Sequence, residues 1–313
     1  MLAGIDIGGT KCAVVLGHEG RIAKQTFFQT AGYSETMTRI FHEIEKLGQF
    51  EAIGISCGGP VDIRQGIIQS PPNLPGWENV PIVSMLEKQF GVPASLQNDA
   101  NACAVAEWRF GAGQGTKNLI FLTFGTGLGA GLILDGKLYC GTNGMAGEIG
   151  HIRMADTGPV GFGKAGSLEG FCSGGGIAQL GRMRALEQFQ TGKAVSFCKD
   201  GDFEAITAKS IGISAEGGDE DAAGVFAESG RMLGLGLSIL IDILNPEKII
   251  IGSVYTRSRK LLEGEMNRAI AREALERACA VCEVVPAALG DEIGSIAALT
   301  VAQDRLDTLK SVE

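Results

Sequence analysis

The sequence has few aromatic residues, few histidines and no excess of basic charge. Aromatic side chains make up 6% of the 313 residues, and histidine occurs three times. Lysine and arginine total 27 against 36 acidic residues, which gives a formal net charge of −9. A protein that binds nucleic acid usually carries a basic patch or stripe, and the sequence contains no Lys/Arg cluster. This composition argues against a nucleic-acid partner.

Long hydrophobic runs, a leader and a disulfide framework are also missing. The longest apolar stretch, 233–244, is too short to span a bilayer and contains Asp242. No basic-then-apolar leader precedes Ile5, and the eight cysteines are scattered. Cys279 and Cys282 form a lone Cys-x-x-Cys pair, which we interpret as core cysteines because a metal knuckle needs two more ligands. The sequence therefore predicts a reduced, cytoplasmic protein without a membrane segment.

Glycine, in contrast, is abundant. The 47 glycines amount to about twice the usual share, and they occur between apolar runs, where a backbone turns tightly or approaches a ligand. A strand, the turn Gly8-Gly9-Thr10 and a second strand open the chain, and the same pattern recurs over 118–134 around Gly125-Thr126-Gly127. This repeat predicts two related α/β halves, each with a hairpin that faces a central cleft.

Hydrophobic periodicity predicts the remaining elements. Helices are expected at 35–47, 83–90, 227–244, 261–278 and 293–304, and strands at 52–57, 94–97, 248–252 and 282–286. Ser34 is the expected N-cap of the first of these helices. Gly234 and Gly236, inside a predicted helix, indicate close packing or close approach of a ligand. The polar segment 192–221 is expected to be a mobile connection.

The two glycine turns are candidate phosphate-binding sites. Glycine lets main-chain N–H groups close on an anion, and Thr10 adds a hydroxyl donor. Asp6, at the end of a buried strand, is suited to hold Mg²⁺ directly or through water. One such turn alone is equally well an ordinary hairpin with a capping aspartate. Two of them favour a site that binds a polyphosphate from both sides.

Two polar clusters fit acid–base and hydroxyl-binding chemistry. Asn98 and Asp99 stand at the start of a predicted helix, where an N-cap is the plain alternative. In the functional interpretation, Asp99 accepts the proton of a hydroxyl that attacks a phosphoryl group. Glu148 and His151 lie three residues apart, so on a helix they face the same way and suit the vicinal hydroxyls of a sugar. An ordinary loop histidine is the alternative for His151.

The ordered set of motifs resembles the ROK family of sugar kinases and sugar-responsive repressors, which has the actin-like ATPase fold of hexokinase. The motifs are Asp-x-Gly-Gly-Thr-Lys at 6–11, Gly-Pro-Val-Asp at 59–62, 98–102, 123–131, Glu-x-Gly-His at 148–151, Asn-Pro-Glu at 245–247 and 290–298. The resemblance implies an α/β fold of two actin-like (ribonuclease H-like) ATPase domains with a ligand cleft between them. We expect a small N-terminal domain at 1–117 plus 294–313 and a large C-terminal domain at 118–293.

The resemblance also implies a role for each matching residue. Asp99 would be the catalytic base for the primary hydroxyl of the sugar. The sugar ring would be held by Asn98, Asp99, Glu148, His151 and Glu169. The nucleotide would be held by Asp6 (through Mg²⁺), Gly8, Gly9, Thr10, Lys11, Gly125, Thr126, Gly127 and, against the adenosine, Gly252.

The sequence departs from the family pattern in two places. In many members the Glu-x-Gly-His histidine is also a zinc ligand, completed by three cysteines of a following motif. Val160, Phe162 and Ser167 stand at those cysteine positions. Because one histidine cannot hold zinc, we predict no structural zinc and expect packing around Phe162 to hold the loop. The second departure is Ser253, which replaces the second glycine of a usual Gly-Gly and is expected to crowd the nucleotide.

The sequence thus predicts an ATP- and Mg²⁺-dependent kinase for the primary hydroxyl of a hexose, with glucose as the default substrate. N-acetylmannosamine, N-acetylglucosamine, fructose, allose and a β-glucoside stay open, because loops rather than motifs select among them. A repressor is disfavoured, since the chain begins directly at the first strand and is acidic. A non-catalytic sugar-binding regulator is disfavoured by the presence of Asp99. The family resemblance also implies a homodimer.

Overall fold

The structure is a computed structural model that describes residues 1–311, and the chain divides into two compact units. The first unit holds 1–115, 131–146 and the chain from 288 onward, and the second holds 116–130 and 147–287. The segment 131–146, which the sequence assigned to the C-terminal domain, thus belongs to the first unit. Residues 312 and 313 of the expected N-terminal domain lie outside the described residues.

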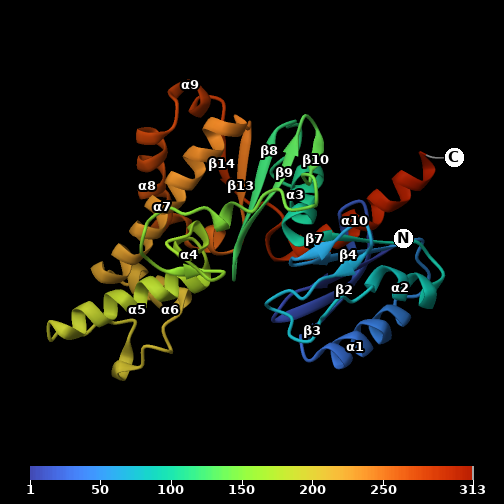
Figure 1. The fold of residues 1–313 in the computed structure, drawn as a ribbon, viewed down its shortest axis with the longest axis horizontal. Coiled ribbons are helices and arrows are strands. Elements are labelled where there is room, and N and C mark those ends of the chain that lie inside the picture. Colours follow the sequence, from blue (N-terminus) through green and yellow to red (C-terminus); the bar gives the residue numbers. More distant parts are fainter. Residues whose placement is uncertain (312–313) are drawn as a thin grey trace. The chain divides into compact units, whose positions relative to one another are not determined.

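The chain forms two five-stranded sheets. The first contains β1 (Leu2–Ile7), β2 (Lys11–His18), β3 (Arg21–Gln29), β4 (Ile53–Cys57) and β7 (Ala94–Asn98), and the second contains β8 (Leu119–Phe124), β9 (Leu128–Leu134), β10 (Lys137–Tyr139), β13 (Lys248–Ile251) and β14 (Glu283–Pro286). The strand orders are β3-β2-β1-β4-β7 and β10-β9-β8-β13-β14, so the two sheets have the same order. The prediction of two related α/β halves is confirmed (Figure 1).

Helices and short elements complete the fold. The α-helices are α1 (Tyr33–Glu45), α2 (Ile82–Phe90), α3 (Asp99–Phe110), α4 (Leu168–Phe171), α5 (Gly174–Gln190), α6 (Ala208–Glu216), α7 (Glu220–Leu244), α8 (Val254–Glu273), α9 (Glu276–Cys279) and α10 (Ile293–Lys310). The short strands are β5 (Val61–Asp62), β6 (Ile67–Ile68), β11 (Val160–Gly161) and β12 (Lys164–Ala165), and the 3₁₀ turns are η1 (Ile149–His151), η2 (Lys199–Gly201) and η3 (Gly290–Glu292).

The first sheet is covered by helices on both faces. Because successive strand residues point to opposite faces, β1 divides its side chains between two cores. Ala3, Ile5 and Ile7 are buried in the core that includes residues of α1 and α2. Leu2, on the opposite face, is buried with Leu299 of α10. The strand that carries Asp6 is therefore fixed between two packed layers (Figure 1).

Two predicted helix boundaries are wrong. The N-cap of α1 is Gly32, whose backbone is extended, and Ser34 lies inside the first turn. The helix begins without a side-chain cap, although Glu35 supplies an acidic residue in its first turn, which favours a helix N-terminus. The helix expected at 261–278 is split into α8 and α9, because Ala274 adopts an extended conformation and ends α8.

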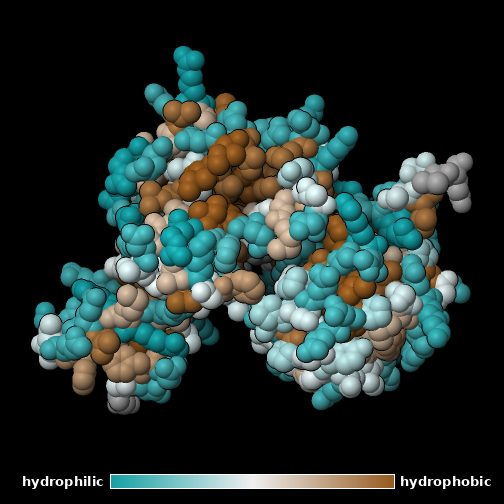
Figure 2. Space-filling view, in the orientation of Figure 1, coloured by the Kyte–Doolittle hydropathy of each residue, from teal (hydrophilic) through white to brown (hydrophobic). Residues whose placement is uncertain are grey.

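Helix α7 is long and apolar enough to cross a membrane by length and composition alone, but 67% of its most apolar window is buried inside the protein. Its glycines explain the burial. A Cβ at Gly234 would lie 2.4 Å from the main-chain oxygen of Met266 on α8, and a Cβ at Gly236 would lie 2.6 Å from Leu168. Close packing therefore accounts for both glycines. Figure 2 shows brown apolar residues on this unit in the area that holds α7, β13 and β14.

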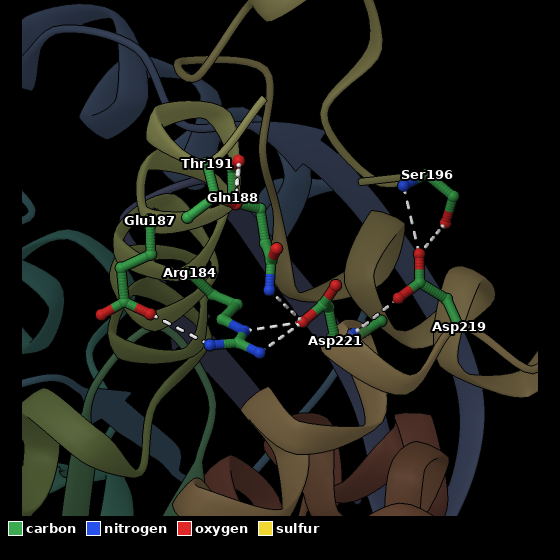
Figure 3. A network of polar contacts seen from close by, with 8 residues as sticks. Arg184, Glu187, Gln188, Thr191, Ser196, Asp219 and Asp221 are labelled. Carbon is green, nitrogen blue, oxygen red and sulfur yellow. Dashed lines mark hydrogen bonds and ion pairs between the residues drawn. The ribbon is translucent and has the colours of Figure 1, made fainter. Parts of the chain in front are cut away.

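The segment expected to be a mobile connection contains α6, which begins with a capping box. Two carboxylates near the end of this segment form hydrogen bonds, one with the start of the segment and the other with α5. Asp219, the N-cap of α7, accepts hydrogen bonds from the main-chain N–H and the hydroxyl of Ser196. Asp221 accepts hydrogen bonds from two side chains of α5, Arg184 and Gln188 (Figure 3). The segment is therefore partly helical and hydrogen-bonded, while its mobility stays a prediction.

Candidate functional site

Three parallel strands of the first sheet end at one edge, and the predicted residues of the first unit follow them. Strand β1 ends at Ile7, β4 at Cys57 and β7 at Asn98. The next residues are the turn Gly8-Gly9-Thr10, then Gly58 after β4, and Asp99 after β7. Ligands of α/β sheets bind at the carboxyl ends of the strands. The structure thus brings the acidic residues and the first glycine turn to an edge suited to a ligand.

The side chain of Asp6 keeps some solvent-exposed surface, but protein atoms surround its carboxylate and exclude most of the water. Burial raises its pKa to about 7, with a further increase from the Asp99 carboxylate, while Lys11 and the Ser56 hydroxyl act in the opposite direction. Ser56 lies opposite Asp6 in the register of β1 and β4. Two nearby carboxylates in a poorly solvated space disfavour ionisation, and a bound cation would reverse that effect.

The structure separates the roles of Asn98 and Asp99. Asn98 is the N-cap of α3, and its Oδ1 accepts the N–H groups of Ala100 (3.0 Å) and Asn101 (3.4 Å). The capping interpretation therefore holds for Asn98. Asp99 is the first residue of the helix, and one of its oxygens, Oδ1, accepts the Ala100 N–H at 2.8 Å. Burial raises the pKa of Asp99 above its ordinary value, although N–H donors act against this.

The first glycine turn is tight and packs on a loop that the sequence did not single out. The N–H of Gly8 donates to the Lys11 oxygen at 3.1 Å, and the hydroxyl of Thr30 donates to the Gly8 oxygen at 2.6 Å. A Cβ at Gly9 would lie 2.7 Å from the Cβ and 2.8 Å from the main-chain oxygen of Asn73. Gly9 is thus required by a close approach of two backbones, a signal that sequence alone does not carry.

Lys11, which follows this turn, is exposed, and its Nζ lies 4.8 Å from the ring centroid of Phe27. Phe27 is 50% exposed. A cation over an aromatic ring is stabilised by about 0.5–1 kcal/mol at such sites. The predicted phosphate-binding lysine is thus partly ordered by a neighbouring strand.

In the second unit, the glycine turn contacts a predicted sugar residue. The N–H of Gly125 donates to the Gly127 oxygen at 3.0 Å, which closes the turn. The N–H of Leu128 donates to Oε2 of Glu169 at 3.0 Å, and a Cβ at Gly127 would lie 2.7 Å from that same oxygen. Residues predicted separately for the nucleotide and for the sugar are therefore adjacent in this unit.

The Glu-x-Gly-His segment packs on the same turn. It forms the single 3₁₀ turn η1, preceded by Glu148, rather than part of an α-helix. A Cβ at Gly150 would lie 2.1 Å from the Leu128 oxygen and 3.3 Å from the Cβ of Glu169. Glu148 and His151 are exposed. The structure thus brings η1, which ends at His151, close to Glu169, with glycine at the position of closest approach.

The loop that lacks the zinc cysteines is held by hydrogen bonds. The carboxamide of Gln179 both donates to and accepts from the main chain of Val160, each at 2.9 Å. Lys164 Nζ donates to the His151 oxygen at 2.7 Å. Phe162 is 68% exposed, and its ring forms a T-shaped pair with the His151 ring, with 6.3 Å between the centroids. The expectation that packing around Phe162 holds the loop is therefore wrong.

Within residues 1–311, no group of three or more His, Cys, Asp or Glu is placed to hold a metal.

Two long helices begin beside the second glycine turn. The N–H of Gly174, at the start of α5, donates to the Gly125 oxygen at 2.8 Å. Ser253, the N-cap of α8, has φ 57° and ψ −112°, and its Oγ lies 3.5 Å from the position of a Cβ at Gly125. Gly252, just before it, is buried and donates to the Leu122 oxygen at 3.0 Å. Helix N-termini favour anions, and the Ser-Gly-Gly-Gly run at 173–176 was a usable signal that sequence reasoning missed.

Comparison with known proteins identifies the relationship. The model of the ROK family matches residues 2–305. The chain belongs to the ROK family. A glucokinase from Halalkalibacterium halodurans is 33% identical over 94% of this chain and 92% of its own length. The family also includes regulators: a xylose repressor from Caldicellulosiruptor bescii is 34% identical over 64% of this chain, which spans about half (49%) of the repressor.

The fold is shared with ROK kinases of known structure. A glucokinase from Streptomyces griseus, solved in complex with glucose and AMPPNP, matches with a TM-score of 0.81 at 30% identity, over 97% of this chain and 99% of its own. The resemblance inferred from the ordered motifs and the two-domain, actin-like α/β fold are therefore confirmed.

Proposed function

We propose that this ROK protein transfers the terminal phosphoryl group of ATP to the primary hydroxyl of a hexose, with glucose as the first candidate. The observation that carries the proposal is the placement of Asp99 at the carboxyl end of β7, next to Asn98 and close enough to Asp6 to affect its pKa. The similarity to glucokinases over nearly the whole chain supports a sugar kinase.

Asp99 is proposed to act as the base. Its Oδ1 accepts a main-chain N–H, which leaves Oδ2 for a ligand hydroxyl. Gly58 adjoins this oxygen: a Cβ at Gly58 would lie 3.8 Å from Oδ2, at van der Waals distance. Because burial raises the pKa of Asp99, the carboxylate is a better proton acceptor than an ordinary aspartate. General-base catalysis of this kind contributes about 10²–10⁴-fold.

Asp6 is proposed to hold the Mg²⁺ that accompanies ATP, and the residues present fit that ion. Mg²⁺ in phosphoryl-transfer sites is bound by one or two carboxylates together with substrate phosphates and waters. A partly exposed carboxylate with a raised pKa suits this role. When bound, the ion neutralises charge on the phosphates.

The other ligand contacts are proposed from the motif positions. The nucleotide phosphates would be bound by Gly8, Gly9, Thr10, Lys11, Gly125, Thr126 and Gly127, with Gly252 against the adenosine. The sugar hydroxyls would be bound by Asn98, Glu148, His151 and Glu169. Glu169, proposed for the sugar, contacts the turn at Gly127, proposed for the phosphates. This contact supports adjacent binding positions for the two ligands in the second unit.

We also propose a cytoplasmic homodimer. All eight cysteines are free thiols in the structure, as expected in a reducing compartment. Large apolar side chains exposed on the second unit, among them Ile243 (72%), Leu275 (67%) and Val281 (56%), are available for an interface between copies. Sedimentation velocity measures the assembly directly, and a monomer at micromolar concentration would contradict the proposal.

The test of the function is ADP release across a panel of hexoses with Mg·ATP, comparing wild type with Asp99→Asn. We expect kcat to fall by about 10³-fold while glucose still raises the melting temperature, because binding stabilises the folded state. Asp135→Asn, at an exposed hairpin position with φ 50°, is the matched control and should leave kcat unchanged.

Two outcomes would contradict the proposal. An Asp99→Asn variant with wild-type kcat would exclude Asp99 as the base. A wild-type protein that is stabilised by a sugar but converts none of the panel would be a non-catalytic regulator.

The sugar with the highest kcat/KM identifies the substrate. The wild-type kcat/KM should also decline as the pH falls through the raised pKa of Asp99, since the base must be deprotonated.

A further inference from the structure

The carboxylate of Asp6 lies directly against the first turn of α10. A Cβ at Gly294 would lie 2.2 Å from Oδ2 of Asp6, 2.8 Å from Cγ and 3.4 Å from Oδ1. Real Cβ atoms do not approach other atoms this closely, so the carboxylate occupies the space that any other residue at 294 would fill. Helix α10 has 18 residues, and its N-terminus favours a negative charge at this position.

The contact cannot be relieved by a shift of α10, because the helix rests directly on the sheet. Gly4 of β1 and Gly54 of β4 are partners in the register of the two strands. A Cβ at Gly4 would lie 3.0 Å from the Cβ of Ala298, and a Cβ at Gly54 would lie 2.0 Å from the Ala298 oxygen and 2.4 Å from the Ala302 nitrogen. Residues 294, 298 and 302 are spaced by four, so they share one helix face.

The start of α10 is also fixed from the side. The carboxamide of Gln25, on β3, donates to the hydroxyl of Ser295 at 2.5 Å. The buried carboxylate of Glu107, on α3, accepts the N–H of Leu289 at 2.8 Å, shortly before the helix begins. Neighbouring strands and α3 therefore hold the first turn in place, so we expect the side chain of Asp6 to adjust when a Cβ is added at 294.

We propose that Gly294 is a positioning residue: by having no side chain, it lets the Asp6 carboxylate take the orientation in which it serves the metal–nucleotide complex. The role of Asp6 rests on the proposed function, whereas the contact with Gly294 does not. A methyl group at 294 turns the carboxylate away without removing its charge. Sugar binding, which involves other residues, is unaffected.

The experiment compares Gly294→Ala with Gly224→Ala. Gly224 lies in α7, is exposed, and has nothing within 4 Å of an added Cβ, so it controls for the effect of a helical glycine-to-alanine change. The readout is the affinity for ADP with Mg²⁺ and with EDTA, measured by calorimetry. In wild type and Gly224→Ala we expect Mg²⁺ to strengthen binding. In Gly294→Ala this enhancement falls by about tenfold and kcat by about 100-fold, since a 1 Å displacement has effects of that size. The sugar KM stays unchanged.

A double-mutant cycle with Asp6→Ala separates the contact from the function. Gly294→Ala alone should lower the melting temperature by about 5 °C, as overpacking does, but it should have little effect when residue 6 is alanine. Independent, additive effects on stability would overturn the contact. Coupled stabilities with an unchanged Mg²⁺ enhancement would overturn the positioning role. A wild-type protein whose ADP affinity does not respond to Mg²⁺ would contradict the proposed function, while the stability cycle would still test the contact.

Discussion

The two glycine turns are built on the same plan but differ in the residue two positions before the first glycine. In the first turn this residue is Asp6, and in the second it is Thr123. The hydroxyl of Thr123 accepts the N–H of Gly129 at 2.9 Å and lies 3.3 Å from the Gly129 oxygen, so it closes its own hairpin. The carboxylate of Asp6 instead faces the first turn of α10. One turn thus has a charged group directed outside the hairpin, and the other has a neutral group used within it.

The surroundings of the turns differ in the same sense. The first turn packs on the Cβ and the main-chain oxygen of Asn73. The second contacts the ends of two side chains, the carboxylate of Glu169 and the hydroxyl of Ser253. The repeated strand–turn–strand unit therefore carries the proposed cation site in one half, and in the other half a turn whose neighbours are mobile side-chain ends.

The largest expected difference between the two turns concerns the residue two positions before the first glycine of each turn, Asp6 in the first turn and Thr123 in the second. Asp6→Asn removes the charge and keeps the shape, so we expect kcat/KM to fall by about 100-fold or more, as loss of a metal-binding or electrostatic group does. Thr123→Val, at the equivalent position, removes hydrogen bonds worth about 1 kcal/mol and should lower the free energy of unfolding by that amount. Its kcat/KM should stay within a few-fold of wild type.

Steady-state kinetics over a range of Mg²⁺ concentrations and urea denaturation measure the two effects. If Thr123→Val changed the Mg²⁺ dependence as strongly as Asp6→Asn, the division of roles between the turns would be wrong.

Much of the fold and of the candidate site was predictable from the sequence, because these features depend on local patterns. The repeated apolar run, glycine turn and apolar run predicts two related halves, and the sheets have the same strand order. Asp6 stands at the end of a buried strand in the sequence as in the structure. Asn98 and Asp99 stand at a helix start, and the structure assigns the capping role to the first of them.

The remainder depends on contacts between distant segments, which local patterns do not encode. Gly9 approaches Asn73, and Gly294 approaches Asp6 from the other end of the chain. The prediction of Ser34 as an N-cap is wrong. It rested on the preference of serine for N-cap positions, but in the structure the helical backbone begins directly after Gly32. The prediction that Phe162 packs to hold the loop is wrong, because hydrogen bonds between Gln179 and the main chain of Val160 fix the loop instead.

A smaller effect is expected from adding one methyl group to each turn. In Gly9→Ala the new Cβ meets the main-chain oxygen of Asn73 at 2.8 Å, and a backbone cannot move away easily. We expect a loss of about 1–3 kcal/mol in the free energy of unfolding, which is typical of overpacking. In Gly127→Ala the new Cβ meets the carboxylate of Glu169, with Oε2 at 2.7 Å, and this end of a long side chain can rotate away.

Gly127→Ala should therefore cost less than Gly9→Ala in stability and more in sugar binding. Displacing Glu169 breaks its hydrogen bond with the Leu128 N–H, so we expect the sugar KM to rise by about tenfold, as loss of a charge-assisted hydrogen bond does. Denaturation and kinetics on the two variants provide the check. Equal stability losses with an unchanged sugar KM would show that both turns have rigid surroundings.

The smallest expected effect concerns the residues that follow the parallel neighbour strand in each sheet. After β4 these residues are Gly58 and Gly59, and after β13 they are Gly252 and Ser253. Ser253 has φ 57° and ψ −112°, a sparsely populated conformation that costs a residue with a Cβ roughly 1–3 kcal/mol. Ser253→Gly restores the pattern of the first sheet, so we expect the free energy of unfolding to rise by about 1 kcal/mol. The KM for ATP should fall by a few-fold if the hydroxymethyl group crowds the nucleotide.

The opposing interaction is the hydrogen bond that Arg257 donates to the Ser253 hydroxyl at 3.3 Å. Its length and the exposure of both residues indicate a contribution below the strain that the substitution relieves. Ser253→Ala, which removes this hydrogen bond and keeps the strained backbone, is the matched control and should be slightly less stable than wild type. A Ser253→Gly variant less stable than Ser253→Ala would show that the positive φ carries no strain at this position, and the two sheets would then differ here only in the hydroxyl group.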